Sequence, residues 1–170
     1  MGGAPKGLLR GSDGATLVDR WRALLEEIDV EVALVGDAAA YAPTTLPRID
    51  DEPSGIGPLG GLVALLRRAD ARPVLALACD MPFVSRRLVD ALLAAPAQAA
   101  IVAPRRDGRW EPLCARYDPV RVLPVAAAHA ASVHHSLQRL LDDAGAVELP
   151  LAHGDRDELQ DWDTPEDMKR

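Results

Sequence analysis

Apolar runs of strand length alternate along this chain with segments of helical periodicity, and this alternation leaves few folds open. Residues 30–35, 73–79 and 99–103 are the clearest apolar runs. Such runs predict strands that are buried on both faces, as in a parallel sheet covered by helices. Residues 16–28 instead repeat apolar side chains every three to four positions, as an amphipathic helix does. The order predicts a three-layer α/β/α sandwich with a mainly parallel sheet, a Rossmann-like fold.

Further segments fit the same alternation. Short strands are expected at residues 48–51, 112–117 and 146–149, and helices after Ser85 and after Asp118, both of which are good N-cap residues. Shorter helices are expected at 135–141 and 164–167. Because no repeat or linker interrupts the pattern, residues 1–170 are predicted to form a single domain.

Composition limits the classes of partner. The formal net charge of −7 argues against a nucleic-acid surface, which needs a concentrated basic face. No apolar run reaches the length of a membrane span, and the N-terminus has no signal-peptide core, so a cytoplasmic protein is expected. Cys79 and Cys114 lie in apolar runs without a CxxC spacing, which favours buried free thiols over a disulfide or a metal site.

The N-terminal segment has the composition of a phosphate-binding loop. Gly2 and Gly3 would let backbone amides approach a phosphate, and Lys6 would supply a positive charge. A glycine-rich N-terminus without a ligand is the alternative.

Asp80 directly follows the most apolar strand run. Ligands in open α/β sheets bind beyond the carboxyl ends of the strands. Mg²⁺ prefers one or two carboxylates together with substrate phosphates, so Asp80 is a candidate magnesium ligand. The alternative is that Asp80 only caps the following turn.

A third group lies where a glycine-rich loop opens a helix. Asp51 precedes Gly55, Gly57, Gly60 and Gly61, and four glycines around a helix start can shape a tight pocket for a base or a ribose. A plain turn is the alternative for this segment taken alone.

Taken in order, these groups resemble the molybdenum cofactor guanylyltransferases and related NTP transferases. Met1-Gly-Gly-Ala-Pro-Lys6-Gly-Leu-Leu9 is similar to the end of their N-terminal glycine signature, and Gly57-Pro-Leu-Gly-Gly-Leu62 to their internal glycine motif. Ala78-Cys-Asp80-Met-Pro-Phe-Val84 is similar to their metal-binding strand end, and Glu111-Pro-Leu-Cys-Ala-Arg-Tyr117 to their substrate-side strand. Asp161-Trp-Asp163-Thr-Pro-Glu-Asp167 resembles their C-terminal motif.

The resemblance implies transfer of GMP from Mg-GTP to molybdopterin, with GTP and molybdopterin as substrates and pyrophosphate as the product. It assigns Lys6 to the α-phosphate, Asp80 to Mg²⁺, and Asp51 to guanine, with Asp50 as the alternative register. The residues assigned to nucleotide binding are Gly2, Gly3, Lys6, Asp51, Gly57, Gly60 and Gly61. Asp161 and Asp163 are assigned to the pterin or metal side, and transient contact with molybdopterin-handling proteins is implied.

One departure from the family bears on the fold. The family begins with an apolar strand and Leu-Ala-Gly-Gly-x-Ser-x-Arg, whereas this sequence starts just after that arginine. The first strand is therefore expected to be missing, with a gap in the sheet beside the site, and a mis-assigned start codon is the preferred explanation. Cytidylyl transfer to the same pterin and a truncated non-catalytic binding relative are the alternative functions.

Overall fold

The structure is a computed structural model that describes residues 6–11, 13–36, 41, 44–151 and 155–161. Its elements follow in the order η1 (Lys6–Leu8), α1 (Leu17–Glu26), β1 (Leu34–Val35), β2 (Arg48–Ile49), α2 (Pro58–Ala69), β3 (Val74–Leu77), α3 (Arg86–Leu93), β4 (Ile101–Ala103), β5 (Arg105–Arg106), β6 (Arg109–Trp110), β7 (Cys114–Tyr117), α4 (Pro119–Ala130), α5 (Leu137–Asp143), β8 (Val147–Glu148) and α6 (Asp155–Glu158).

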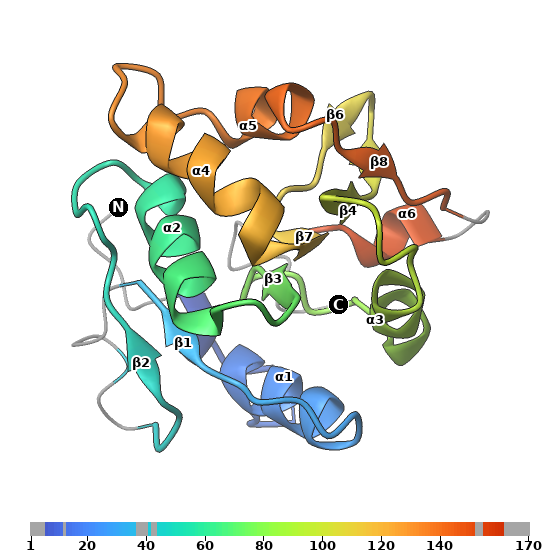
Figure 1. Cartoon of the computed structure of the whole chain (residues 1–170). Coiled ribbons are helices and arrows are strands. Elements are labelled where there is room, and N and C mark those ends of the chain that lie inside the picture. Colours follow the sequence, from blue (N-terminus) through green and yellow to red (C-terminus); the bar gives the residue numbers. More distant parts are fainter. Residues whose placement is uncertain (1–5, 12, 37–40, 42–43, 152–154, 162–170) are drawn as a thin grey trace.

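Helices cover both faces of a central sheet with strand order β3-β7-β4-β8. α2 and α4 pack side by side on one face, and α3 lies on the other (Figure 1). Two separate clusters of buried apolar side chains fill the spaces between these layers, one on each face of the sheet. The predicted α/β/α sandwich is thereby confirmed.

Successive side chains of the buried strands point alternately into one of these two clusters and into the other. In β4, Ile101 and Ala103 belong to the cluster beneath α2 and α4, whereas Val102 belongs to the cluster beneath α3. In β7, Tyr117 and Cys114 likewise point to opposite faces. Successive side chains of a strand project to opposite sides, so a strand that is apolar at every position needs a helical layer on each side.

The sheet is mixed in direction, a detail that the strand patterns did not predict. β7 runs antiparallel to both β3 and β4, whereas β4 and β8 are parallel. β1 and β2 form a separate two-stranded parallel sheet. β5 and β6 form a hairpin, also unpredicted, whose turn places Asp107 and Gly108 at positive φ.

Local signals placed most helix starts correctly. Thr16 accepts a hydrogen bond from the backbone N–H of Asp19, whose side chain in turn accepts from Thr16, a complete capping box. Ser85 and Asp118 cap α3 and α4 as predicted. The helix expected at 164–167 lies outside the described residues. None of the described helices is long and apolar enough to cross a membrane.

Both thiols are predicted to resist alkylation in the folded chain. Burial raises the pKa of Cys114 to about 12 and also raises the pKa of Cys79, because a buried site disfavours the charged thiolate. At pH 8 we expect a maleimide reagent to label each cysteine slowly in native buffer and rapidly in guanidinium chloride, as read by mass spectrometry. Rapid labelling of native Cys114 would contradict its burial.

Candidate active site

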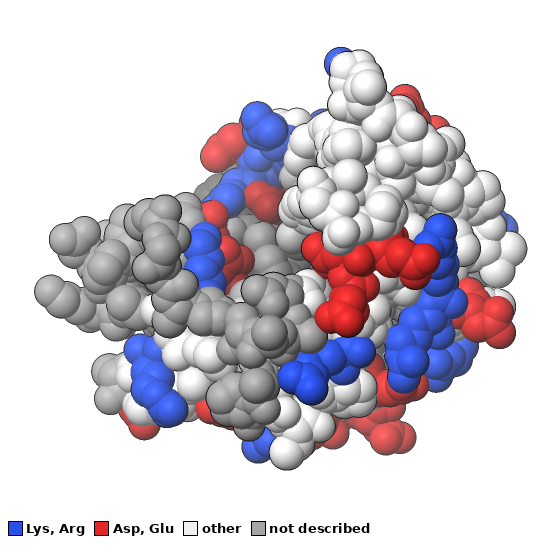
Figure 2. All heavy atoms as spheres, turned by 90° about the vertical axis from the view of Figure 1, so that its left-hand side faces the viewer, with Lys and Arg blue, Asp and Glu red and all other residues white. Residues whose placement is uncertain are grey.

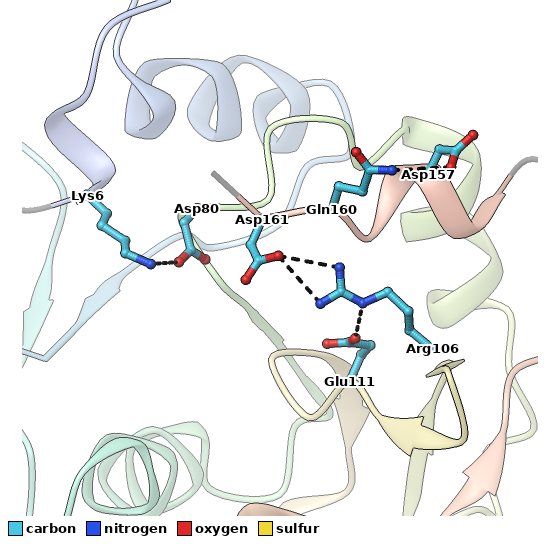
Figure 3. Close-up of polar contacts among 7 residues, drawn as sticks. All are labelled: Lys6, Asp80, Arg106, Glu111, Asp157, Gln160 and Asp161. Carbon is cyan, nitrogen blue, oxygen red and sulfur yellow. Dashed lines mark hydrogen bonds and ion pairs between the residues drawn. The ribbon is translucent and has the colours of Figure 1, made fainter. Parts of the chain in front are cut away.

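Lys6 and Asp80, 74 positions apart in sequence, form an ion pair. The Lys6 ammonium on η1 lies 2.8 Å from a carboxylate oxygen of Asp80, just beyond the carboxyl end of β3 (Figure 3). The Lys6 side chain is 45% exposed and that of Asp80 20% exposed. A partly exposed pair of this kind adds at most about 1 kcal/mol to stability. The pair therefore contributes little to folding. Its position at a strand end, where ligands bind in such folds, indicates a role in ligand binding instead.

Tyr41 links the two segments that carry this ion pair. Its hydroxyl accepts a hydrogen bond of 3.3 Å from the backbone N–H of Gly7 and lies 3.7 Å from the sulfur of Cys79. A Cβ atom at Gly7 would lie 2.9 Å from the Tyr41 ring, so glycine allows this close approach. Burial raises the pKa of Tyr41 to about 12, which keeps the hydroxyl neutral. No motif in the sequence indicated Tyr41.

The internal glycines have separate physical roles. Gly57, at the start of α2, has φ 67° and ψ −154°, a region that only glycine adopts readily. A Cβ atom at Gly60 would collide with the carbonyl oxygen of Pro53. A Cβ atom at Gly61 would lie 2.9 Å from a carboxylate oxygen of Asp51. The motif therefore brings the preceding loop, including Asp51, directly against the first turn of α2.

Geometry distinguishes the two aspartates that follow β2. Asp51 lies against Gly61 and borders the large cavity of the molecule. Asp50 is exposed and is absent from the cavity lining. A base held in that cavity could meet the Asp51 carboxylate, whereas Asp50 does not border the cavity.

The cavity has a volume of about 620 Å³. Tyr41, Asp51, Gly57 and Asp80 all border it. The carboxylates assigned from the sequence to the metal and to the base thus share one hollow with apolar walls, and Lys6, assigned to phosphate, contacts the Asp80 carboxylate. Such a hollow, with few convergent polar groups, is the usual form of a small-molecule site.

A second polar cluster, drawn in the same close-up, centres on Arg106 of β5 (Figure 3). Its guanidinium lies 2.9 Å from the carboxylate of Glu111 and 3.4 Å from that of Asp161. Burial alone would lower the pKa of Arg106, but the two carboxylates raise it, so the guanidinium stays charged. Burial also raises the pKa of Glu111, although Arg106 opposes this shift.

Asp161 is held in place by the residues just before it. Leu159 is fully buried in the core beneath α3. Glu158 accepts a hydrogen bond from the backbone N–H of Ser85 and pairs with Arg87 at 3.0 Å. These contacts fix the end of α6 against α3 and bring Asp161 to Arg106. Arg106 carried no signal in the sequence.

Charge on the face that carries α2 and β2 is mixed. Figure 2 shows Lys and Arg side chains interleaved with Asp and Glu among the described residues of this face. Within the described residues, no three His, Cys, Asp or Glu side chains are grouped closely enough to hold a metal by themselves. A metal held at Asp80 would therefore need further ligands from a substrate or from water. Gly2, Gly3 and Asp163 lie outside the described residues.

The amino-acid sequence was compared with models of known protein families. The sequence model of the MobA-like NTP transferase domain matches residues 1–148. The chain belongs to this family. It is therefore a nucleotidyltransferase of the MobA-like type, and the resemblance inferred from the motifs is confirmed.

Named relatives of this MobA-like NTP transferase agree. It is 32% identical to a molybdenum cofactor guanylyltransferase of Pseudomonas putida over 99% of this chain and 89% of the relative. A protein of the same name from Xanthomonas euvesicatoria is 33% identical over 92% of this chain and 80% of the relative.

Solved structures confirm the fold of this MobA-like NTP transferase. The molybdopterin-guanine dinucleotide biosynthesis protein A of Archaeoglobus fulgidus superposes with a TM-score of 0.78 at 19% identity, covering 96% of this chain and 86% of that one. The 2-C-methyl-D-erythritol 4-phosphate cytidylyltransferase of Thermus thermophilus gives 0.72 at 18% identity, covering 98% and 91%. At these identities the likeness concerns the fold alone.

Proposed function

We propose that this chain transfers GMP from Mg-GTP to the terminal phosphate of molybdopterin and releases pyrophosphate. The observation that carries the proposal is the Lys6–Asp80 pair at 2.8 Å, whose carboxylate borders the cavity. An ammonium and a carboxylate in contact complement a magnesium triphosphate, because the ammonium attracts the phosphate oxygens and the carboxylate attracts the metal. The names of the Pseudomonas relatives support the choice of substrates.

The reaction needs positioning and charge neutralisation but no covalent protein intermediate. A terminal phosphate oxygen of the acceptor attacks the α-phosphorus of GTP, and the bond from that phosphorus to the bridging oxygen of the β-phosphate breaks. Pyrophosphate leaves with the electron pair of that bond. Two anions must approach each other in line, so cationic groups around the α-phosphorus lower the barrier.

The donor set at the strand end fits Mg²⁺. Asp80 offers a hard carboxylate that is partly exposed, and a neighbouring cation, the Lys6 ammonium, already occupies its oxygen. When bound, Mg²⁺ would neutralise charge on the phosphates and on the leaving pyrophosphate. Nucleotide binding would separate the pair, with Lys6 turning to the phosphates and Asp80 holding the metal.

Asp51 is proposed to read the base. A carboxylate can accept two hydrogen bonds side by side, and guanine presents adjacent N–H donors on its ring and its exocyclic amine. Gly61 leaves room for the Asp51 carboxylate beside the first turn of α2. Cytosine offers a single exocyclic amine at its pairing edge, so the arrangement favours GTP over CTP.

Pyrophosphate release tests the proposal directly. The chain would be incubated with Mg²⁺, molybdopterin and either GTP or CTP, and pyrophosphate would be measured by a coupled assay. We expect release with GTP that depends on molybdopterin and far less with CTP. Preference for CTP would make the chain a cytidylyltransferase. Absence of release with both, in a chain that still binds molybdopterin, would identify a non-catalytic binding relative.

The Arg106 cluster is proposed to position the pterin side of the site. In Arg106→Ala, Asp161 loses its partner at 3.4 Å, so the segment that carries it is no longer held toward the acceptor. We expect the KM for molybdopterin to rise by about tenfold to a hundredfold, as for loss of a charged hydrogen bond. The KM for GTP should change little.

Two variants control this test. Arg106→Lys should restore binding only in part, because an ammonium cannot bridge two carboxylates as the planar guanidinium does. Arg86→Ala removes an arginine paired with Asp90 on α3 and should leave both KM values unchanged. An equal rise in the KM for GTP in Arg106→Ala would contradict a role on the acceptor side.

A further inference from the structure

The β5–β6 hairpin that carries Arg106 has two faces with different surroundings. Arg105 lies opposite Trp110 in the register of the hairpin. Residues directly opposite each other share a face, whereas successive residues of one strand alternate between faces. Arg105 and Trp110 therefore lie on one face, and Arg106 lies on the other, where its guanidinium contacts Asp161 (Figure 3). The contacts of Trp110 thus act on the face opposite Arg106.

Gln138 of α5 holds the backbone of Trp110 with two hydrogen bonds. The side-chain oxygen of Gln138 accepts from the Trp110 N–H at 3.0 Å, and its side-chain nitrogen donates to the Trp110 carbonyl at 2.8 Å. A primary amide carries an acceptor and donors side by side, so one side chain satisfies both backbone groups. The hairpin is thereby tied to α5, beside which β6 lies (Figure 1).

The Trp110 side chain adds further contacts with α5. It is 5% exposed and packs in the apolar cluster that contains Leu140 and Leu141. Its indole N–H donates a hydrogen bond of 2.7 Å to the carboxylate of Asp142. The Arg105 guanidinium lies 3.7 Å from the centre of its ring. Because the ring is buried and covered by Arg105, it does not offer a stacking surface to a ligand, and its contacts instead fasten the hairpin.

A short turn connects the fastened strand to Arg106. The turn consists of Asp107 and Gly108, both at positive φ, and a two-residue turn of this kind fixes the register of the two strands. Arg106 therefore follows any movement of Trp110 on α5. Asp161 is held instead by the contacts of α6 with α3. A shift of the hairpin on α5 would thus change the distance between Arg106 and Asp161.

We propose that Gln138 and Trp110 are positioning residues for the acceptor substrate. By fixing the hairpin on α5, they determine where Arg106 meets Asp161 and hence how tightly molybdopterin binds. The inference rests on the proposed function, in which the Arg106 cluster forms the acceptor side of the site. Neither Gln138 nor Trp110 is among the described residues that line the cavity, so both act through Arg106.

Gln138→Met removes both hydrogen bonds to the Trp110 backbone and keeps an unbranched side chain of similar length. We expect the KM for molybdopterin to rise about threefold to tenfold, less than in Arg106→Ala, because the guanidinium is displaced but still present. The KM for GTP and kcat at saturating substrates should not change. Pyrophosphate release would give these constants. Hydrogen exchange of residues 105–110 should also become faster, because the Trp110 N–H loses its acceptor.

A second pair of variants tests the same contacts through the indole. Asp142→Leu leaves the buried Trp110 N–H without its acceptor and should raise the KM for molybdopterin in the same direction. Asp142→Asn keeps an oxygen that can accept this hydrogen bond and should stay close to the parent chain. Gln98→Met is the matched control for Gln138→Met. Gln98 is exposed, and its backbone oxygen rather than its side chain accepts a hydrogen bond from Arg121.

A double variant distinguishes positioning from a general loss of structure. If Gln138 acts through Arg106, then Gln138→Met should raise the KM for molybdopterin by less than about twofold in a chain that already carries Arg106→Ala. Independent effects would multiply instead. Melting followed by circular dichroism would establish that each variant is folded, and the two Asp142 variants decide the matter if Gln138→Met is not.

Three results would overturn the inference. An equal rise in the KM for GTP in Gln138→Met would show a general loss of structure. Multiplied effects in the double variant would show that Gln138 does not act through Arg106. A KM for molybdopterin equal to that of the parent in both Gln138→Met and Asp142→Leu would show that these contacts do not position the acceptor. A parent chain that neither releases pyrophosphate nor binds molybdopterin would instead overturn the proposed function, and the inference with it.

Discussion

Asp80→Asn is expected to reduce kcat by at least about 10²–10³-fold, the loss measured when a single charge-stabilising group is removed from an active site. Asparagine has nearly the shape of aspartate but no negative charge, so it binds Mg²⁺ poorly and leaves the Lys6 ammonium without this counter-charge. Pyrophosphate release at saturating Mg-GTP would measure the effect. Because the Lys6–Asp80 pair is partly exposed, the melting temperature should hardly change.

Asp29→Asn is the matched control for Asp80→Asn. Asp29 lies after α1 at a φ of 57°, a conformation that asparagine tolerates as well as aspartate. Full activity in Asp29→Asn and its loss in Asp80→Asn would assign the effect to the strand end. Activity of Asp80→Asn within twofold of the parent would remove Asp80 from the metal site, and with it the main support for the transferase mechanism.

Gly60→Ala is expected to destabilise the fold, although alanine normally stabilises a helix interior. The usual gain from glycine to alanine in a helix is about 0.5–1 kcal/mol. Here the new methyl group would collide with the backbone carbonyl of Pro53, which cannot turn away as a side chain can. We expect a net loss of about 1–3 kcal/mol in the free energy of unfolding, measured by urea denaturation. A gain in stability would show that the contact yields easily.

Gly61→Ala is the matched comparison in the same turn. Its methyl group would lie 2.9 Å from side-chain atoms of Asp51 and Val35, which can move. Stability should therefore fall less than in Gly60→Ala. Displacement of the Asp51 carboxylate should instead raise the KM for GTP while leaving that for molybdopterin unchanged. An unchanged KM for GTP would count against Asp51 as the base-reading residue.

Several parts of the candidate site could be predicted because their signals are local. A glycine required at positive φ, an aspartate after an apolar strand and a hydroxyl or carboxylate at a helix start each leave a mark within a few residues. Gly57, Asp80 and Ser85 were found in this way. Tyr41 and Arg106 were missed, because each acts on a residue distant in sequence and belongs to no motif.

The strand at residues 30–35 shows what the local sequence pattern could not predict, namely how many residues pair with a neighbouring strand. Its apolar composition predicted a strand of six residues, yet Leu34–Val35 alone pairs in the ladder with β2. A strand is completed by its neighbours, and the two-residue β2 is its one partner among the described residues. Residues of β1 and β3, which do not pair with each other in the described part of the chain, both line the cavity.

By itself, the sequence determined the layered α/β architecture, most helix starts and the family, because periodicity, capping and motif order depend on neighbours along the chain. Only the tertiary structure decided that β7 runs antiparallel, that Asp51 rather than Asp50 borders the cavity, and that Arg106 holds Asp161. Strand direction and long-range pairing depend on how distant segments bury their apolar faces together. Strand direction and long-range pairing are therefore determined by the packing of the whole chain and not by the sequence of any single segment.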